Sequence, residues 1–337
     1  MRYFQHKWPA ILLWPLSLLY AAVISIRNLL YDYGIKKSFK VPCKVISVGN
    51  ITVGGTGKTP TVITLARELA PKKVCIISRG YGRTSRGPVI VSNYQSVLAD
   101  VEQSGDEPRM MALALPGVPV IVDRDRVNGA RLAIEKFHPD IIILDDGFQH
   151  RRLHRDVDIV TLGGERPFGN GMVLPAGPLR EPLRNLKRGH VYWLNGATEV
   201  PAQLKSMDKP VILADYVTEG LYNIRGEFIS KDLDQTPVAA FTGLANPGNF
   251  VQTLHGMGAD LKVFISYKDH YRYTQQDIIR LKALFTKHDI QWLITTDKDR
   301  VKLPVNDLDP GKWGTIKITI APRNRNEFVT WVKTVSH

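Results

Sequence analysis

From residue 41 onward, apolar runs rich in β-branched residues alternate with segments whose apolar positions recur at a helical period. This alternation predicts parallel strands joined by helices, as in an α/β layer fold. The strands predicted in the first block are 44–48, 74–77, 118–122, 141–144, 157–162 and 191–194. The helices predicted between them are 59–70, 107–115 and 126–137.

A second block with the same alternation begins near residue 236. Its predicted strands are 238–241, 262–267, 292–295 and 315–320, and its predicted helices are 248–257, 274–287 and 326–335. Residues 215–228 are predicted to be an extended connector with a turn at Gly226. We therefore divide the chain into an apolar helix with a basic flank at 1–40, a larger α/β domain at 41–214, a linker at 215–235 and a smaller α/β domain at 236–337.

The turn between the first strand and the first helix has the sequence Thr52-Val-Gly-Gly-Thr-Gly-Lys-Thr59. A glycine-rich turn that ends in Gly-Lys-Thr at this position is typical of a phosphate-binding P-loop. Backbone N–H groups and the helix N-terminus would hold the phosphates of ATP, with Lys58 at the β- and γ-phosphates and Thr59 on Mg²⁺. The predicted ATP contacts are Thr52, Val53, Gly54, Gly55, Thr56, Gly57, Lys58 and Thr59.

Residue 52 departs from the strict P-loop pattern, which has a glycine there. Gly54 and Gly55 are expected to give the turn the backbone freedom that it needs. The alternative interpretation is a chance glycine-rich turn, which the flanking strand and helix disfavour.

The strand 141–144 runs directly into Asp145 and Asp146. An apolar strand that ends in carboxylates is typical of a Walker B element, which holds Mg²⁺ directly or through water. In the alternative interpretation, one of the two aspartates caps the turn at Gly147. Which of them would touch the metal first is open at this stage.

Asp106 and Glu107 stand at the predicted start of another helix. Asp106 is either the N-cap of this helix or the base that takes a proton from an attacking hydroxyl, with Glu107 near the metal. His270 follows a strand of the second block. Most single histidines are structural, but beside a carboxylate in a cleft His270 would orient that carboxylate or share its proton.

Polar motifs follow several predicted strands, at the edge where open parallel sheets bind ligands. The predicted substrate contacts in these motifs are Tyr81, Arg83, Arg124, Gln149, His150 and Arg180. Arg180 lies in a proline- and glycine-rich loop and would bind an anionic group bidentately, unless this is an ordinary surface loop. His150 and His154 have the spacing of a zinc pair but lack a convincing ligand set.

The formal net charge of +13 indicates an anionic partner: nucleic acid, an anionic membrane or a phosphorylated substrate. Because no arginine-rich tail, zinc-finger spacing or aromatic RNA-binding motif is present, we do not expect nucleic acid. Cys43 and Cys75 each lie in a predicted strand and are expected to be small buried residues of a reducing compartment.

Residues 8–26 carry no charge and are rich in Leu, Ile, Trp and Ala. The basic residues that flank them are Arg2, Lys7, Arg27, Lys36, Lys37 and Lys40. A cleaved signal peptide fits poorly, a spanning helix is marginal in length, and Pro9 and Pro15 are expected to break or kink the first half. We favour a helix in the cytoplasmic leaflet, held by Trp8, Trp14 and the basic flanks, over a helix packed on the protein itself.

Taken in order, these motifs resemble the tetraacyldisaccharide 4′-kinase family of lipid A biosynthesis over nearly the whole chain. The motifs that carry the resemblance are 48–60, 78–83, 105–108, 145–150, 174–181, 241–247 and 269–271. In that family a serine or threonine is usual at the position of Thr52.

The resemblance implies a kinase that uses Mg²⁺ and ATP to phosphorylate the 4′-hydroxyl of an acylated glucosamine disaccharide 1-phosphate, giving lipid IVA. It implies two P-loop or Rossmann-like α/β/α domains joined by a two-stranded linker, at the cytoplasmic face of the bacterial inner membrane. No obligate protein partner is expected. Asp106 would be the base and His270 its partner, with Lys58 as a further catalytic residue. Thr59, Glu107, Asp145 and Asp146 would surround the metal.

Two other classes of function were weighed. A membrane-associated partitioning or division-site-positioning ATPase also carries Gly-Gly-x-Gly-Lys-Thr, but its characteristic lysine would fall at residue 53, where this chain has Val53. A nucleic-acid-binding NTPase is suggested by the charge alone.

Overall fold

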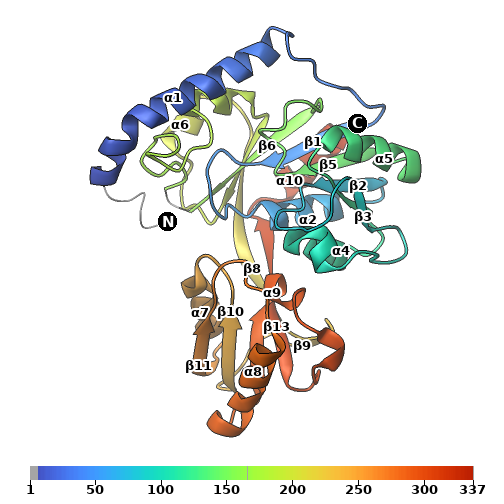
Figure 1. Ribbon diagram of the computed structural model, residues 1–337, viewed down its shortest axis with the longest axis vertical. Helices are drawn as coiled ribbons and strands as arrows, with labels where there is room; N and C mark the ends of the chain where they lie inside the picture. Colours follow the sequence, from blue (N-terminus) through green and yellow to red (C-terminus); the bar gives the residue numbers. More distant parts are fainter. Residues whose placement is uncertain (1–6, 165, 337) are drawn as a thin grey trace.

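The computed structural model describes residues 7–164 and 166–336 (Figure 1). The strands are β1 (Lys44–Gly49), β2 (Val74–Ser78), β3 (Val89–Ser92), β4 (Val120–Val122), β5 (Ile141–Asp145), β6 (Val157–Gly163), β7 (Val191–Asn195), β8 (Val211–Asn223), β9 (Phe228–Ser230), β10 (Pro237–Thr242), β11 (Asp260–Ser266), β12 (Trp292–Thr296) and β13 (Trp313–Pro322). Within the described residues they form one 13-stranded sheet, ordered β11-β10-β12-β13-β8-β7-β6-β1-β5-β2-β4-β3, with β9 paired to β8.

The helices are α1 (Lys7–Asp32), α2 (Lys58–Glu68), α3 (Val101–Ser104), α4 (Asp106–Ala114), α5 (Arg126–Phe137), α6 (Ala202–Lys205), α7 (Pro247–Gly256), α8 (Gln275–His288), α9 (Asp297–Arg300) and α10 (Arg325–Ser336). Two short 3-10 segments are η2 (Leu183–Arg188) and η3 (Val305–Asp307). The predicted α/β class is confirmed. Strand β3 and the four-residue helices α3, α6 and α9 were not predicted, because elements this short show too little periodicity.

The sheet of the first block is covered by helices on both faces. Side chains alternate along a strand, so neighbouring residues of β1 enter different cores. Ile46 packs in one buried cluster with Leu65 of α2, whereas Val45 packs in another with Val127 of α5. The strands from β7 to β4 are parallel. Their following loops therefore share one edge, where the glycine-rich turn lies.

The second block has its own core on either side of β10, β11 and β12, with Phe250 of α7 in one cluster and Leu281 of α8 in the other. Strands β8 and β13 run antiparallel between the blocks, and Figure 1 shows them as the connection between the upper and lower parts of the molecule. Residues 215–228, predicted as an extended connector, lie in and after β8.

Helix α10 returns to the first block, although it was predicted as part of the second. Phe328 meets Trp193 of β7 edge-on, with ring centroids 5.2 Å apart, and Val332 joins the same core. Strand β13 causes this return because it runs antiparallel to β8 and ends near Ala214, beside the first block. The division into 1–40, 41–214, 215–235 and 236–337 stays a prediction. The structure differs from it in one respect, because α10 packs on the first block.

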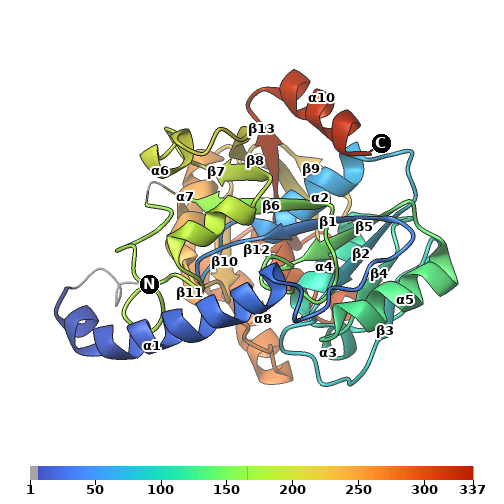
Figure 2. The ribbon, with the colours of Figure 1, turned by 90° about the horizontal axis from the view of Figure 1, so that it is seen from above.

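Helix α1 is continuous through Pro15, so the predicted break does not occur. It lies along the first block (Figure 2), where the Ser17 hydroxyl donates to the carbonyl of Val173 and the Asn28 amide donates to Glu181. The helix exposes eight large apolar side chains, Leu12, Trp14, Leu16, Leu18, Leu19, Val23, Ile26 and Leu29, which we call the outer stripe. It thus packs on the protein through Ser17, Asn28, Tyr20 and Ala21 and presents the outer stripe outward. Arg2 and the side chain of Trp8 lie outside what the structure describes.

The two cysteines are free thiols. Cys75 is buried in β2 as predicted, and burial raises the pKa of its thiol above the ordinary value. Cys43 is half-buried and directly precedes β1, so its predicted place inside a strand was wrong by one residue.

Candidate active site

The glycine-rich turn 52–59 wraps the N-terminus of α2 and is held from two sides. Gly57 caps the helix with a φ of 80°, and a Cβ there would collide with Asn195. The Asn195 amide donates to the Thr56 carbonyl at 2.7 Å, and the N–H of Val53 donates to the Pro178 carbonyl at 2.8 Å. Gly54 has the expected left-handed φ of 104°, whereas Gly55 does not use that region. The turn therefore has the form of a P-loop, fixed by the end of β7 and by the loop 174–181.

Asp145 ends β5 with a fully buried carboxyl group. One oxygen accepts a hydrogen bond from the Ser78 hydroxyl at 2.8 Å, and the other, Oδ1, has no partner. Burial, followed by the charges of Glu107 and Asp146, raises the pKa of this carboxyl from 3.8 to about 7. A buried acid with an unpartnered oxygen and acidic neighbours suits a site that a cation completes.

Asp146 is surrounded by positive charge instead. Its carboxylate lies 3.7 Å from Lys58 Nζ, and both oxygens accept from Arg180 Nη1 at 3.0 Å. Burial pushes the pKa of Asp146 upward, but Lys58 and Arg180 outweigh it and leave the pKa below its ordinary value. Arg180, predicted to bind an anionic substrate, is paired with Asp146 in this structure.

Asp106 is the first residue of α4 and not its N-cap. Gly105 occupies the cap position, with a φ of 88° and no side-chain capping bond. The Asp106 Oδ2 atom lies 3.0 Å from Nδ1 of His270, which follows β11. The N-cap interpretation is therefore wrong, and the predicted pairing of Asp106 with His270 is present in the structure.

Tyr81 lies beside this pair. A Cβ at Gly105 would come within 2.7 Å of the Tyr81 carbonyl, so the loop 78–83 packs closely on the start of α4. The exposed Tyr81 ring lies 5.5 Å from the His270 ring, measured between centroids. An exposed aromatic ring therefore lies beside the Asp106–His270 pair.

The remaining predicted substrate residues differ in exposure. Arg83 is buried and donates to the carbonyls of Val122 and Gly87, so its guanidinium stabilises the fold. Arg124 is exposed. His150 is half-buried, and burial, assisted by Arg126, lowers its pKa to about 4.

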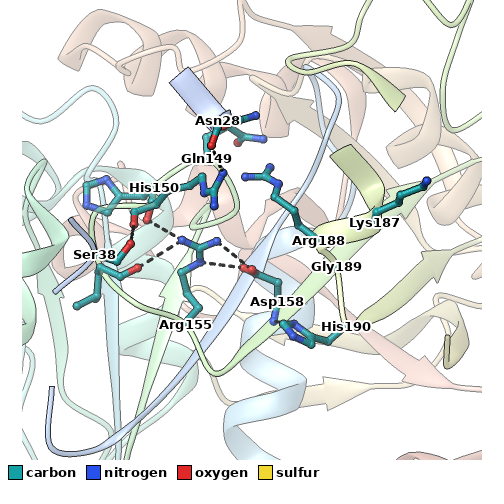
Figure 3. Close-up of polar contacts among 12 residues, drawn as sticks. Asn28, Ser38, Gln149, His150, Arg155, Asp158, Lys187, Arg188, Gly189 and His190 are labelled. Atoms are coloured by element: carbon teal, nitrogen blue, oxygen red, sulfur yellow. Dashed lines mark hydrogen bonds and ion pairs between the residues drawn. The ribbon is translucent and has the colours of Figure 1, made fainter. Parts of the chain in front are cut away.

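Gln149 lies in a polar cluster between α1 and the loop 174–181. Its amide donates to the carbonyl of Asn50 and to Glu181, whose carboxylate is completely buried. Figure 3 shows Arg188 near Gln149, and Arg155 between Asp158 and the backbone of His150. Asn28, Gln149 and Arg188 all lie on the side where α1 crosses the first block.

The chain was compared with known proteins. The family model described as tetraacyldisaccharide-1-P 4′-kinase matches residues 9–337. The chain belongs to this family. A tetraacyldisaccharide 4′-kinase from Syntrophus aciditrophicus is 38% identical over 95% of this chain and 92% of its own length. One from Aquifex aeolicus is 42% identical over 86% of this chain and 88% of its own length.

A solved structure of this kinase family agrees with the fold. The crystal structure of LpxK from Aquifex aeolicus in complex with ATP superposes with a TM-score of 0.82 at 36% identity. The match covers 97% of this chain and 99% of that one. The mixed α/β sheet described above is therefore the fold of the kinase family.

Sequence reasoning missed several residues of this kinase site. Asn195 and Glu181 are fully buried, and Arg126 is buried beside the two aspartates, whose charges act on its pKa. Lys298 and Lys302 reach the Asp106–His270 pair. Their single signal in the sequence was their position after predicted strands, which also holds for many residues without a function.

The described residues contain no group of three or more His, Cys, Asp and Glu side chains that could hold a metal. The zinc interpretation of His150 and His154 gains no support, since the His154 side chain is 40% exposed and its Nε2 lies 3.7 Å from Asp156 Oδ1. A magnesium site needs fewer protein ligands, because Mg²⁺ keeps waters and substrate phosphates around one or two carboxylates. Asp145, with its unpartnered Oδ1, fits that role.

Proposed function

We propose that this chain is an ATP-dependent lipid kinase that phosphorylates the 4′-hydroxyl of a tetraacyldisaccharide 1-phosphate, giving lipid IVA. The observation that carries the proposal is the contact of 3.0 Å between Asp106 and His270, at the edge of the sheet that also holds the P-loop. Membership of the kinase family and the ATP complex of the Aquifex aeolicus protein support it.

The P-loop and its neighbours would bind and orient ATP. Lys58, Thr59 and the N–H groups of the turn would hold the β- and γ-phosphates. When bound, Mg²⁺ would neutralise phosphate charge, held by Thr59 and Asp145, with Asp146 and Glu107 in the surrounding shell. The charge of Glu107 raises the pKa of the Asp145 carboxyl. Because Asp106 directly precedes Glu107 in the chain, this supports a position of Asp106 near the metal.

Asp106 would act as the general base. Its carboxylate would take the proton of the 4′-hydroxyl as that oxygen bonds to the γ-phosphorus, while the bond from the γ-phosphorus to the β–γ bridging oxygen breaks and ADP leaves. His270 would orient the carboxylate through Nδ1. Tyr81 would lie against the sugar, and Gln149, His150 and Arg180 would face the disaccharide and its phosphate.

The outer stripe of α1 supports a location at the cytoplasmic face of the inner membrane. The segment Leu12–Asp32 is long and apolar enough to cross a membrane, yet Ser17 and Asn28 tie it along the first block. A helix held lengthwise by its polar side would lie in the leaflet, with the stripe among acyl chains and the basic residues at anionic headgroups. The acylated substrate would then be bound without leaving the membrane surface.

The assay uses the full chain with Mg²⁺, γ-labelled ATP and the disaccharide monophosphate in detergent. We expect label in the lipid product. Absence of labelled lipid, under conditions where the protein is folded and binds ATP, would overturn the proposed function.

A further inference from the structure

The segment from Thr296 to Lys302 begins at the end of β12 and contains α9, and the proposed reaction gives it no role. Its backbone is fixed by the fully buried carboxylate of Asp299. That carboxylate accepts hydrogen bonds from the Thr242 hydroxyl at 2.7 Å, the Gly243 N–H at 3.0 Å and the Thr296 hydroxyl at 2.8 Å. The short helix α9 is thereby tied to the end of β10, and a side chain that leaves it has a defined starting point.

Lys298 extends from α9 to His270. Its Nζ lies 2.9 Å from Asp269 Oδ1 and 3.3 Å from His270 Nε2, and only 18% of its side chain is exposed. A lysine ammonium has three donors and no acceptor, so Nε2 must offer its lone pair in this contact. The one proton of the neutral ring is then on Nδ1, which faces Asp106 Oδ2 at 3.0 Å.

We propose that Lys298 is a positioning residue that sets the tautomer of His270 before the ring meets Asp106. Lys298, Asp269 and His270 all belong to the second block, whereas Asp106 belongs to the first. The second block therefore presents a ring whose N–H already points toward the base. The effect of Lys298 on turnover rests on the proposed kinase function, whereas its effect on the tautomer does not.

Asp106 Oδ2 faces Nδ1 of the His270 ring and lies 3.9 Å from Lys302 Nζ. The Lys298 ammonium and Asp269 face Nε2 of the ring. Without Lys298, the ring would lie between two carboxylates, since Asp269 Oδ1 is 3.9 Å from Nε2. A ring that turned its single N–H toward Asp269 would no longer donate to Asp106. Lys298→Met should therefore lower kcat and leave the KM values for ATP and lipid unchanged.

The tautomer is measured directly by NMR of the protein labelled with ¹⁵N in its histidine rings, with the His270 signals assigned from their loss in His270→Gln. Asp106→Ala alone should keep the proton on Nδ1, because Lys298 still donates to Nε2. Asp106→Ala combined with Lys298→Met should move the proton to Nε2. A proton on Nε2 in Asp106→Ala alone would overturn the proposal.

Turnover supplies the second test. Lys298→Met should lower kcat by about tenfold or more, a part of the 10²–10⁴ that a positioned base contributes. Lys298→Arg, which keeps a charged donor, should recover most of it. The control is Lys268→Met, an exposed lysine of the loop that carries Asp269 and His270. Wild-type kcat in Lys298→Met would overturn the proposal, whereas an inactive wild type with the expected tautomers would overturn only the kinase function.

Discussion

Asp106 of α4 and His270 lie 3.0 Å apart, although 164 residues separate them in the chain. The contact joins the first block to the second across the loops that follow the strands. If Asp106 is the base that we propose, His270 orients it only when both blocks are in place.

Asp106→Ala should abolish most turnover without loss of ATP binding. General-base catalysis contributes about 10²–10⁴ to a rate, so kcat should fall by at least two orders of magnitude. The dissociation constant for ATP should stay close to that of the wild type, because the P-loop is held by Asn195 and the loop 174–181 and not by Asp106. Turnover comparable to the wild type would rule out Asp106 as the base.

The surroundings of Asp106 and His270 show which parts of the candidate site the sequence predicts and which it does not. The P-loop and Asp145–Asp146 are contiguous motifs whose strand and turn context is readable along the chain, so their places were predicted. Lys298 and Lys302 acquire their role through the packing of α9 against β10, which no local pattern encodes. From its own sequence context Asp106 was equally compatible with a helix cap; the family resemblance favoured a base, and Gly105 occupies the cap position.

Helix α1 shows a second limit of prediction from the sequence. Its composition predicted an apolar helix, but the side that it turns toward the protein depends on partners far away in sequence. Ser17 and Asn28 are buried because Val173 and Glu181 meet them, Tyr20 and Ala21 pack on the same block, and most of the leucines remain exposed. In most soluble helices the opposite arrangement holds, with the apolar side inward.

Leu19→Gln with Val23→Gln should detach the protein from anionic vesicles. These side chains are 64% and 56% exposed on the outer stripe, and burial of an apolar side chain is worth about 1.5–3 kcal/mol, so vesicle affinity should fall by tenfold or more. Co-sedimentation with vesicles measures this. The control is Ile279→Gln, which changes a side chain 60% exposed on α8. Equal losses in both variants, or none in either, would contradict docking through α1.

Glu181→Ala should destabilise the fold strongly. The carboxylate is fully buried and accepts from Asn28, Gln149, Asn185 and Arg188. Its loss leaves Arg188 unpaired in a mostly buried site, and breaking a buried ion pair costs about 3–5 kcal/mol. Denaturant unfolding measures the loss. Glu102→Ala, which removes an exposed pair with Arg272, should cost only about 0–1 kcal/mol. Similar losses in the two variants would contradict the assigned burial.

Asp145 should make stability fall as the pH rises. Its pKa is about 7 in the folded chain against 3.8 ordinarily, so its contribution is fully present below pH 3.8 and is lost as the pH rises through about 7. Each unit of difference corresponds to about 1.4 kcal/mol. Melting temperatures from pH 5 to 8 should fall more steeply for the wild type than for Asp145→Asn.

The raised pKa of Asp145 also predicts how stabilisation by Mg²⁺ should depend on pH. Below pH 7 a cation at Asp145 must displace a proton, so Mg²⁺ should raise the melting temperature more at pH 8 than at pH 6. The difference should vanish in Asp145→Asn. A Mg²⁺ effect independent of pH in the wild type would place the metal away from Asp145.

Lys302 and Asp299 should behave as one buried unit. Their side chains are 3% and 0% exposed, with Nζ 2.7 Å from Oδ1. Each single variant, Lys302→Met or Asp299→Asn, leaves one buried charge unpaired and should lower the free energy of unfolding by about 3–5 kcal/mol. The double variant removes both charges and should recover at least half of that loss. Lys302 Nζ also lies 3.9 Å from Asp106 Oδ2, so kcat should stay low in the double variant while stability returns. If kcat returned together with stability, Lys302 would act on Asp106 only by keeping the second block folded.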